Sequence, residues 1–257
     1  MNNFARQNED ASSREPVFNM PPVVVALAVL LAGIHAARMY LISADTDLEV
    51  LIRFAFIPAR FGAEAAELGL PGGAGADLWM FVTYAYLHGD WVHLAVNVFW
   101  LAAFGSAVAW RFGALRFLLL SAAAAIGGAV AHLIAHPGEF VPVIGASGAV
   151  SGLMAAAARF VFFRRRVRAV GAEAWRYPAP PLLVALRDGR VLIFLAVWFG
   201  LNLLVGIGAP PIAGVEGEIA WQAHIGGFFV GLLMFSVFDP KHPEQPARRW
   251  DDVLPPM

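Results

Sequence analysis

Ten polar side chains lie within, or at the ends of, long apolar stretches of this 257-residue sequence. Polar groups at membrane depth are energetically costly, so each is a candidate for function. No aspartate or glutamate lies inside these stretches, which disfavours a proton- or sodium-coupled carrier because such carriers usually need one. The ten candidates are His35, His93, Asn97, Ser121, His132, Ser147, Ser151, Asn202, Gln222 and His224.

One serine and one histidine of this set could perform acyl transfer. A serine hydroxyl is a poor nucleophile until a base takes its proton, and a neutral histidine is the usual base. Ser147 lies in the motif Gly-Ala-Ser-Gly at an expected helix start, where free backbone N–H groups favour an oxyanion. His224 is the candidate base, and without a third acid the two would form a dyad. His93 and Asn97 lie one helical turn apart and could both donate to the same developing charge.

These residues must be positioned by helices that cross a membrane. Hydrophobic residues make up 59% of the chain and charged residues only 14%, whereas soluble domains are nearer one-quarter charged. A backbone in lipid must satisfy its own hydrogen bonds, and the stretches do not alternate as barrel strands do. The predicted fold class is therefore an all-α membrane protein with six spans. They are roughly Pro22–Ile42, Trp91–Val108, Phe117–His136, Gly145–Phe163, Val191–Ile207 and Ile219–Phe238.

Arginines are concentrated in the links after the second and fourth spans and in the C-terminal tail. Since cytoplasmic loops carry an excess of basic residues, we predict that these links and both termini are cytoplasmic. The long loop at about residues 43–90 then lies outside and is expected to contain short interfacial helices. This rule is weakly opposed by three arginines that lie in the outer loop or just before it: Arg38, Arg53 and Arg60. Arg38 and Arg159 lie near the ends of spans, from which their side chains could snorkel to the headgroups.

The predicted topology brings the candidate residues to a common depth. His93 and Asn97 open the second span and Ser147 opens the fourth, and both spans run from outside to inside. His224 lies about five residues into the sixth span, roughly 7.5 Å below its start. The four polar groups are therefore expected to meet in the outer leaflet.

Three segments are predicted along the chain: a polar cytoplasmic tail at residues 1–19, a membrane domain at 20–238, and a polar cytoplasmic tail at 239–257. The first tail has no hydrophobic core near its start and is not expected to be a signal peptide. The second is proline-rich and is expected to be disordered. The absence of cysteine excludes cysteine-ligated metal sites, and a net charge of -1 gives no reason to expect nucleic acid as a partner.

Three motifs resemble the signatures of the rhomboid family of intramembrane serine proteases: His93-Leu-Ala-Val-Asn97, Gly145-Ala-Ser-Gly148, and Ala-His224-Ile-Gly-Gly227-Phe-Phe-Val-Gly231. The resemblance covers about residues 84–238. It implies a six-helix bundle of the bacterial inner (plasma) membrane that cleaves the transmembrane segments of other proteins, with membrane lipid as its surrounding and no cofactor or metal. In such an enzyme Ser147 attacks, His224 is the base, and His93, Asn97 and the Ser147 N–H form the oxyanion hole. The resemblance also implies that the glycines allow close packing: Gly145, Gly148, Gly227 and Gly231.

Two positions depart from the family pattern. The family often has an aromatic residue four positions after the serine, stacking on the histidine, and here this residue is Ser151. It also often has a glutamate between two glycines after the second span, where this chain has Ala109. The first departure concerns the orientation of His224, and the second concerns folding more than chemistry.

Other interpretations of these residues remain open. Gly148 and Gly152 could simply form a helix-packing seam, and Asn97 could make an interhelical hydrogen bond. His132 and His136 are four residues apart and could hold a metal, although a packing role is preferred for them. The main alternative function is a catalytically inactive rhomboid-like protein that binds membrane helices. Such relatives lack the serine or the histidine, and this chain has both.

Overall fold

The computed structural model describes residues 20–166, 177–206 and 220–240. Within these ranges the helices are joined by turns and irregular loops, and two loop residues, Phe56 and Val143, form an isolated antiparallel bridge. The predictions for the tails at 1–19 and 241–257 lie outside the described residues. The helices are α1 Pro22–Tyr40, α2 Ala44–Phe54, η1 Pro58–Phe61, α3 Gly73–Thr83, η2 Tyr84–Tyr86, α4 Trp91–Trp100, η3 Leu101–Gly105, α5 Ser106–Phe112, α6 Ala114–Ala135, α7 Ser147–Ala158, η4 Val161–Arg166, α8 Leu182–Ala185, α9 Gly189–Gly206 and α10 Trp221–Phe238.

Four of these segments are long and apolar enough to cross a membrane: α1, the continuous run Trp91–Phe112 through α4, η3 and α5, α6, and α10. Two of the six predicted spans are shorter apolar helices in the described chain, at Ser147–Phe163 and Gly189–Leu204. The prediction of an all-α membrane protein is confirmed. The count of six spans stays a prediction, because length and apolar composition identify only four.

Local sequence signals explain several helix boundaries. Pro22 begins α1, where its missing N–H is not needed. The Ser43 side chain accepts a hydrogen bond from the Thr46 N–H at the start of α2, and Asp90 accepts one from the His93 N–H at the start of α4. Gly113, at φ 76°, separates α5 from α6. The chain therefore reverses between α5 and α6 without a long loop.

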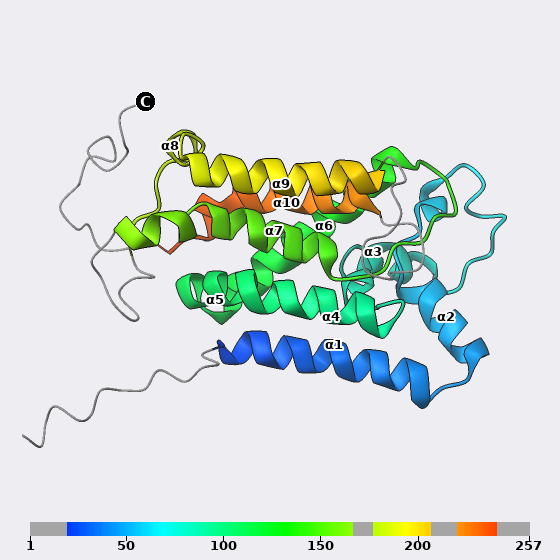
Figure 1. Cartoon of the computed structure of the whole chain (residues 1–257). Helices are drawn as coiled ribbons and strands as arrows, with labels where there is room; N and C mark the ends of the chain where they lie inside the picture. Colours follow the sequence, from blue (N-terminus) through cyan, green and yellow to red (C-terminus); the bar gives the residue numbers. More distant parts are fainter. Residues whose placement is uncertain (1–19, 167–176, 207–219, 241–257) are drawn as a thin grey trace, which may run out of the picture.

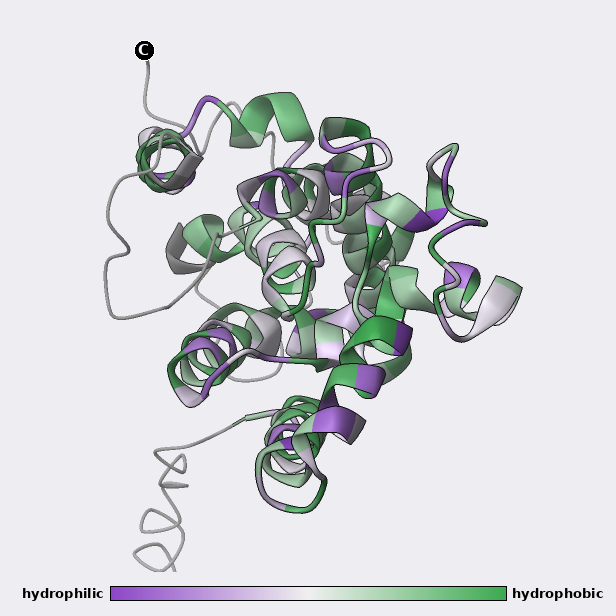
Figure 2. Ribbon diagram, turned by 90° about the vertical axis from the view of Figure 1, so that its right-hand side faces the viewer, coloured by the Kyte–Doolittle hydropathy of each residue, from purple (hydrophilic) through white to green (hydrophobic). Residues whose placement is uncertain are grey.

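The helix α7 lies at the centre of the bundle, where its residues from Gly148 to Ala158 are all buried, and it packs closely against α6 and α10 (Figure 1). The helix α1 contacts the α4–α5 segment at one side of the bundle, and α9 contacts α10 at the other. Small residues make the central contacts possible, since Gly127 and Gly128 on α6, and Gly226 and Gly227 on α10, face neighbouring backbone directly. The outer helices instead expose large apolar side chains such as Ile193, which is 67% exposed. Figure 2 shows hydrophobic residues along most of the ribbons.

The two arginines expected to snorkel are instead buried inside the protein. Arg38 is paired with Asp47, with 2.7 Å between Nε and Oδ1, and it donates to the His88 carbonyl at 2.8 Å. Arg159 donates to the Leu232 and Pro180 carbonyls at 3.3 and 3.1 Å. The snorkelling prediction is therefore wrong, because both guanidinium groups turn inward: Arg38 meets a carboxylate and a carbonyl, and Arg159 meets two carbonyls.

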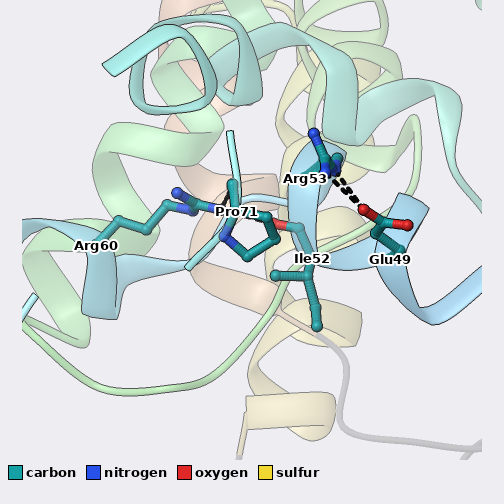
Figure 3. Close-up of polar contacts among 5 residues, drawn as sticks. All are labelled: Glu49, Ile52, Arg53, Arg60 and Pro71. Carbon is teal, nitrogen blue, oxygen red and sulfur yellow. Dashed lines mark hydrogen bonds and ion pairs between the residues drawn. The ribbon is translucent and has the colours of Figure 1, made fainter. Parts of the chain in front are cut away.

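The long first loop contains two α-helices, α2 and α3, at one end of the bundle (Figure 1). Its two arginines also have internal partners. Arg53 forms an ion pair with Glu49, and Arg60 donates to the Ile52 and Pro71 carbonyls at 3.0 and 2.6 Å (Figure 3). Both arginines are thus held by partners within the loop, and the predicted orientation of the chain stays a prediction.

Candidate active site

Ser147 is the first residue of α7, and it is half-buried. The preceding loop is tied down by backbone hydrogen bonds: Val143 exchanges two with Phe56 at 2.8 and 3.0 Å, and the Gly145 N–H donates to the Tyr84 carbonyl at 3.0 Å. No side chain caps α7 among the described residues. Because the first N–H groups of a helix have no intrahelical partner, those at Ser147 and after it remain free to meet an anion.

Gly145 brings the serine loop against His93. Its φ of 116° is one that residues with a Cβ rarely adopt. A Cβ at this position would lie only 2.6 Å from Nε2 of His93. The His93 ring therefore lies directly against the backbone two residues before Ser147. Gly145 was predicted to allow close packing, and its neighbour in the structure is a side chain of α4 rather than a second helix backbone.

His88 belongs to the same cluster, although the sequence pattern gave it no role. Its side chain is fully buried, and its Nε2 lies 3.5 Å from the Ala146 N–H, which donates to it. Its ring meets His93 edge-on with centroids 5.1 Å apart. Burial, more than the nearby positive charge that His93 could carry, lowers the pKa of His88 to about 3. His88 is therefore neutral at physiological pH and can accept from the loop. Its only sequence signal is its position five residues before His93.

Asn97 lies one turn after His93 on α4, and only 4% of it is exposed. Its Nδ2 donates to the His93 carbonyl at 2.9 Å. An amide nitrogen carries two protons, so this bond leaves one N–H for another acceptor. The predicted alternative of an interhelical bond is not what the structure has, since this bond lies within α4.

His224 lies in the first two turns of α10 and is half-buried. Its Nδ1 is 2.9 Å from Oδ1 of Asn202 on α9. In the described part of the chain, no hydrogen bond joins the Ser147 hydroxyl to the His224 ring. Catalytic hydrogen bonds are often long in free enzymes and shorten when substrate binds.

The helices that carry Ser147 and His224 touch through their backbones. A Cβ on Gly148 would lie 3.3 Å from the Ala223 carbonyl oxygen, and one on Gly152 would lie 2.8 Å from the Gly227 carbonyl oxygen. A Cβ on Gly231 would in turn overlap the Gly152 backbone. The contact therefore runs along both helices, and it begins at the residues that adjoin Ser147 and His224.

The residues that depart from the family pattern are both buried. Ser151 lies four residues after Ser147 on α7, and Ala109 lies on α5. No aromatic ring stacks on His224 in the part of the chain described here. The polar contact that the His224 ring makes is instead the one between its Nδ1 and Oδ1 of Asn202.

His132 and His136 have protein partners. His132 Nε2 lies 3.1 Å from the Val141 carbonyl oxygen, while His136 contacts Glu139 through Nδ1 and Gln222 through Nε2, each at 3.0 Å. These bonds join the end of α6 to the following loop and to the start of α10. In the described ranges, no group of three or more His, Cys, Asp or Glu side chains could hold a metal ion.

Comparison with known proteins identifies a family for this chain. The Rhomboid domain family model matches residues 75–240. The chain is 31% identical over 152 residues to rhomboid protease GluP of Bacillus subtilis, covering 59% of this chain and 27% of that protein. It is 27% identical over 162 residues to rhomboid protease GlpG of Haemophilus influenzae, covering 62% of this chain and 68% of that protein. It is 26% identical over 223 residues to RHOMBOID-like protein 4 of Arabidopsis thaliana, covering 82% of this chain and 50% of that protein.

The matched region spans only 27% of the Bacillus subtilis protein and 50% of the Arabidopsis thaliana protein. The family match nevertheless extends over more than half of the chain and contains all three motifs. The long apolar helices of the chain are those of an integral membrane protein. The chain therefore belongs to the rhomboid family, whose named members include proteases.

Proposed function

We propose that this protein is an intramembrane serine endopeptidase that uses Ser147 as nucleophile and His224 as base. The observation that carries the proposal is the close approach of Gly148 to the Ala223 carbonyl. A Cβ added to Gly148 would lie 3.3 Å from that carbonyl oxygen. Gly148 directly follows Ser147, and Ala223 directly precedes His224. Two side chains able to form a dyad are thus attached to backbones in van der Waals contact, in a family whose named members include proteases.

The reaction would run as in other serine hydrolases. The Ser147 Oγ attacks the carbonyl carbon of the scissile bond while His224 Nε2 takes its proton. His93, Asn97 and the Ser147 backbone N–H donate to the oxygen that becomes negative. His224 then gives the proton to the leaving amine, and a water, deprotonated by the same ring, hydrolyses the acyl-enzyme.

The substrates we propose are transmembrane segments of other proteins, cut near their outer end. A helical substrate hides its carbonyl groups in hydrogen bonds, so it must unwind locally, and small or helix-breaking residues are expected at the cleavage point. We further propose six spans within residues 20–238, with both tails cytoplasmic, in a bacterial plasma membrane. Membrane lipid then surrounds the protein, and the chemistry requires no cofactor.

The test is cleavage of a model transmembrane substrate by purified protein, together with labelling by a serine-directed phosphonate. Ser147→Ala and His224→Ala should each abolish cleavage and labelling while leaving thermal stability near that of the wild type. Ser121→Ala is the matched control, since the Ser121 hydroxyl donates to the Phe117 carbonyl within α6 at 2.8 Å and should be replaceable. Binding of the substrate without cleavage or labelling by the wild type would instead support the inactive binder.

A further inference from the structure

We infer that Asn202 is a positioning residue that holds the proton of neutral His224 on Nδ1 and so leaves Nε2 free to act as the base. This inference rests on the proposed function. A neutral imidazole can carry its proton on either nitrogen, and only the unprotonated nitrogen can accept one. In a dyad without an acidic third residue, another group must stabilise the tautomer that is protonated on Nδ1.

The orientation of the Asn202 amide is set by a second hydrogen bond. Its Nδ2 donates to the Trp198 carbonyl, one turn earlier on α9, at 2.9 Å. Turning the amide over would place Oδ1 against that carbonyl oxygen, and two acceptors would then face each other. Since Asn202 is only 8% exposed, water cannot easily relieve that repulsion. The Asn202 Oδ1 must therefore face His224.

An acceptor facing Nδ1 at 2.9 Å decides the protonation of the ring. Oδ1 has no hydrogen to donate, so the bond exists only if His224 Nδ1 carries the proton. The lone pair is then on Nε2, the nitrogen that a serine base requires. In Ser-His-Asp triads the aspartate chooses this form, and imposing the wrong one costs about 10⁴ in rate.

An aromatic contact keeps the two helices in register at this bond. Trp198, four residues before Asn202, stacks on Phe228, four residues after His224, with ring centroids 4.1 Å apart. Two pairs of residues, each one turn apart, therefore meet across the same face of α9 and α10. Phe199 adds a second ring against Phe228 at 5.3 Å. The stacked rings limit sliding of α9 along α10, and this keeps the amide opposite the imidazole.

The experiment compares Asn202→Leu, which keeps the size of the side chain and removes both polar atoms, with the wild type. The control is Leu201→Ala, the neighbouring residue on α9, whose side chain is 49% exposed. Ring ¹⁵N NMR of histidine-labelled protein, with His224 assigned by loss of its signals in His224→Gln, reports which nitrogen carries the proton. The kcat and KM for a transmembrane substrate are measured on the same samples.

In the wild type the His224 proton should be on Nδ1, and in Asn202→Leu the form protonated on Nε2 should appear. The kcat should fall roughly 10- to 100-fold with little change in KM. This loss is smaller than the roughly 10⁴-fold loss seen when a triad histidine is held in the wrong tautomer, because in Asn202→Leu both tautomers remain accessible. Asn202→Asp, which keeps an acceptor on Nδ1, should restore the Nδ1 proton and move the acidic limb of the kcat profile to higher pH. Leu201→Ala should match the wild type.

A proton on Nε2 in the wild type would overturn the inference, as would an unchanged proton position and kcat in Asn202→Leu. Loss of thermal stability with the Nδ1 proton retained would also overturn it, since that result describes a packing residue only. The NMR measurement needs no substrate. A wild type that neither cleaves nor labels would therefore reject the proposed function, while the proton position still decides the role of Asn202.

Discussion

Gly227→Ala is the substitution that most directly tests the contact between α7 and α10. A Cβ at this position would lie 2.7 Å from the Gly148 carbonyl carbon and closer still to its oxygen. Nonbonded carbon atoms prefer about 3.5–4.0 Å, so the two helices would have to separate by about 1 Å. No flexible side chain is available to move aside, because both contacting groups are backbone.

The expected size of the effect follows from that displacement. Overpacking of a close contact costs about 1–3 kcal/mol of stability. His224 lies one turn from Gly227, so the displacement would move it away from Ser147, and a 1 Å misplacement of reacting groups can cost about 10² in rate. We therefore expect a variant that folds, melts at lower temperature and cleaves about 100-fold more slowly.

The assay measures kcat/KM on a model transmembrane substrate and thermal unfolding in the same detergent. Gly200→Ala is the matched control, because a Cβ at that position on α9 meets nothing within 4 Å. It should retain wild-type activity and be neutral or slightly stabilising, since alanine is a better helix former than glycine. Wild-type cleavage and stability in Gly227→Ala would refute the view that direct backbone contact positions the two side chains.

Three further predictions concern the histidine cluster, the oxyanion donors and the orientation. Burial lowers the pKa of His88 in the folded protein to about 3, below its ordinary value of 6.5. The stability that the neutral His88 ring contributes is therefore complete above pH 6.5 and is lost as the pH falls toward 3. Unfolding temperatures should fall between about pH 7 and pH 4, and they should fall less steeply in His88→Asn. His93→Ala and Asn97→Ala should each lower kcat by about 10²–10³ with little change in KM, and some activity should remain because the Ser147 N–H is unaffected; normal kcat in Asn97→Ala would make Asn97 a packing residue only. A topology reporter fused after Asp239 should be cytoplasmic and one near Gly138 should be outside, and the reverse result would place the proposed site in the wrong leaflet.

The all-helical class and the family could be predicted from sequence because they depend on local patterns. Apolar stretches mark α1, α6 and α10 to within a few residues, and the three motifs have fixed spacing. The roles of Ser147 and His224 remain predictions. The pairing of Asn202 with His224 could not be foreseen, because it depends on how α9 is rotated about its axis and where it slides along α10.

The burial of His88 and of the arginines was equally hidden in the sequence. His88 is buried because a loop far along the chain folds over it, so its neighbours depend on tertiary structure. Arg38 was expected to extend to the headgroups, but Asp47 and a backbone carbonyl meet it from the next helix and from the loop that ends at α4. A single sequence indicates that such side chains are unusual and does not identify their partners.

The glycine contact between α7 and α10 has a consequence for how this protein can evolve. At Gly152, Gly227 and Gly231 an added Cβ would overlap backbone atoms of the facing helix, so these positions leave almost no room for variation. The outer faces of α1 and α9 present separate apolar side chains that can be exchanged one at a time. Substitutions are therefore expected to be tolerated on these outer faces far more readily than at the contact between α7 and α10.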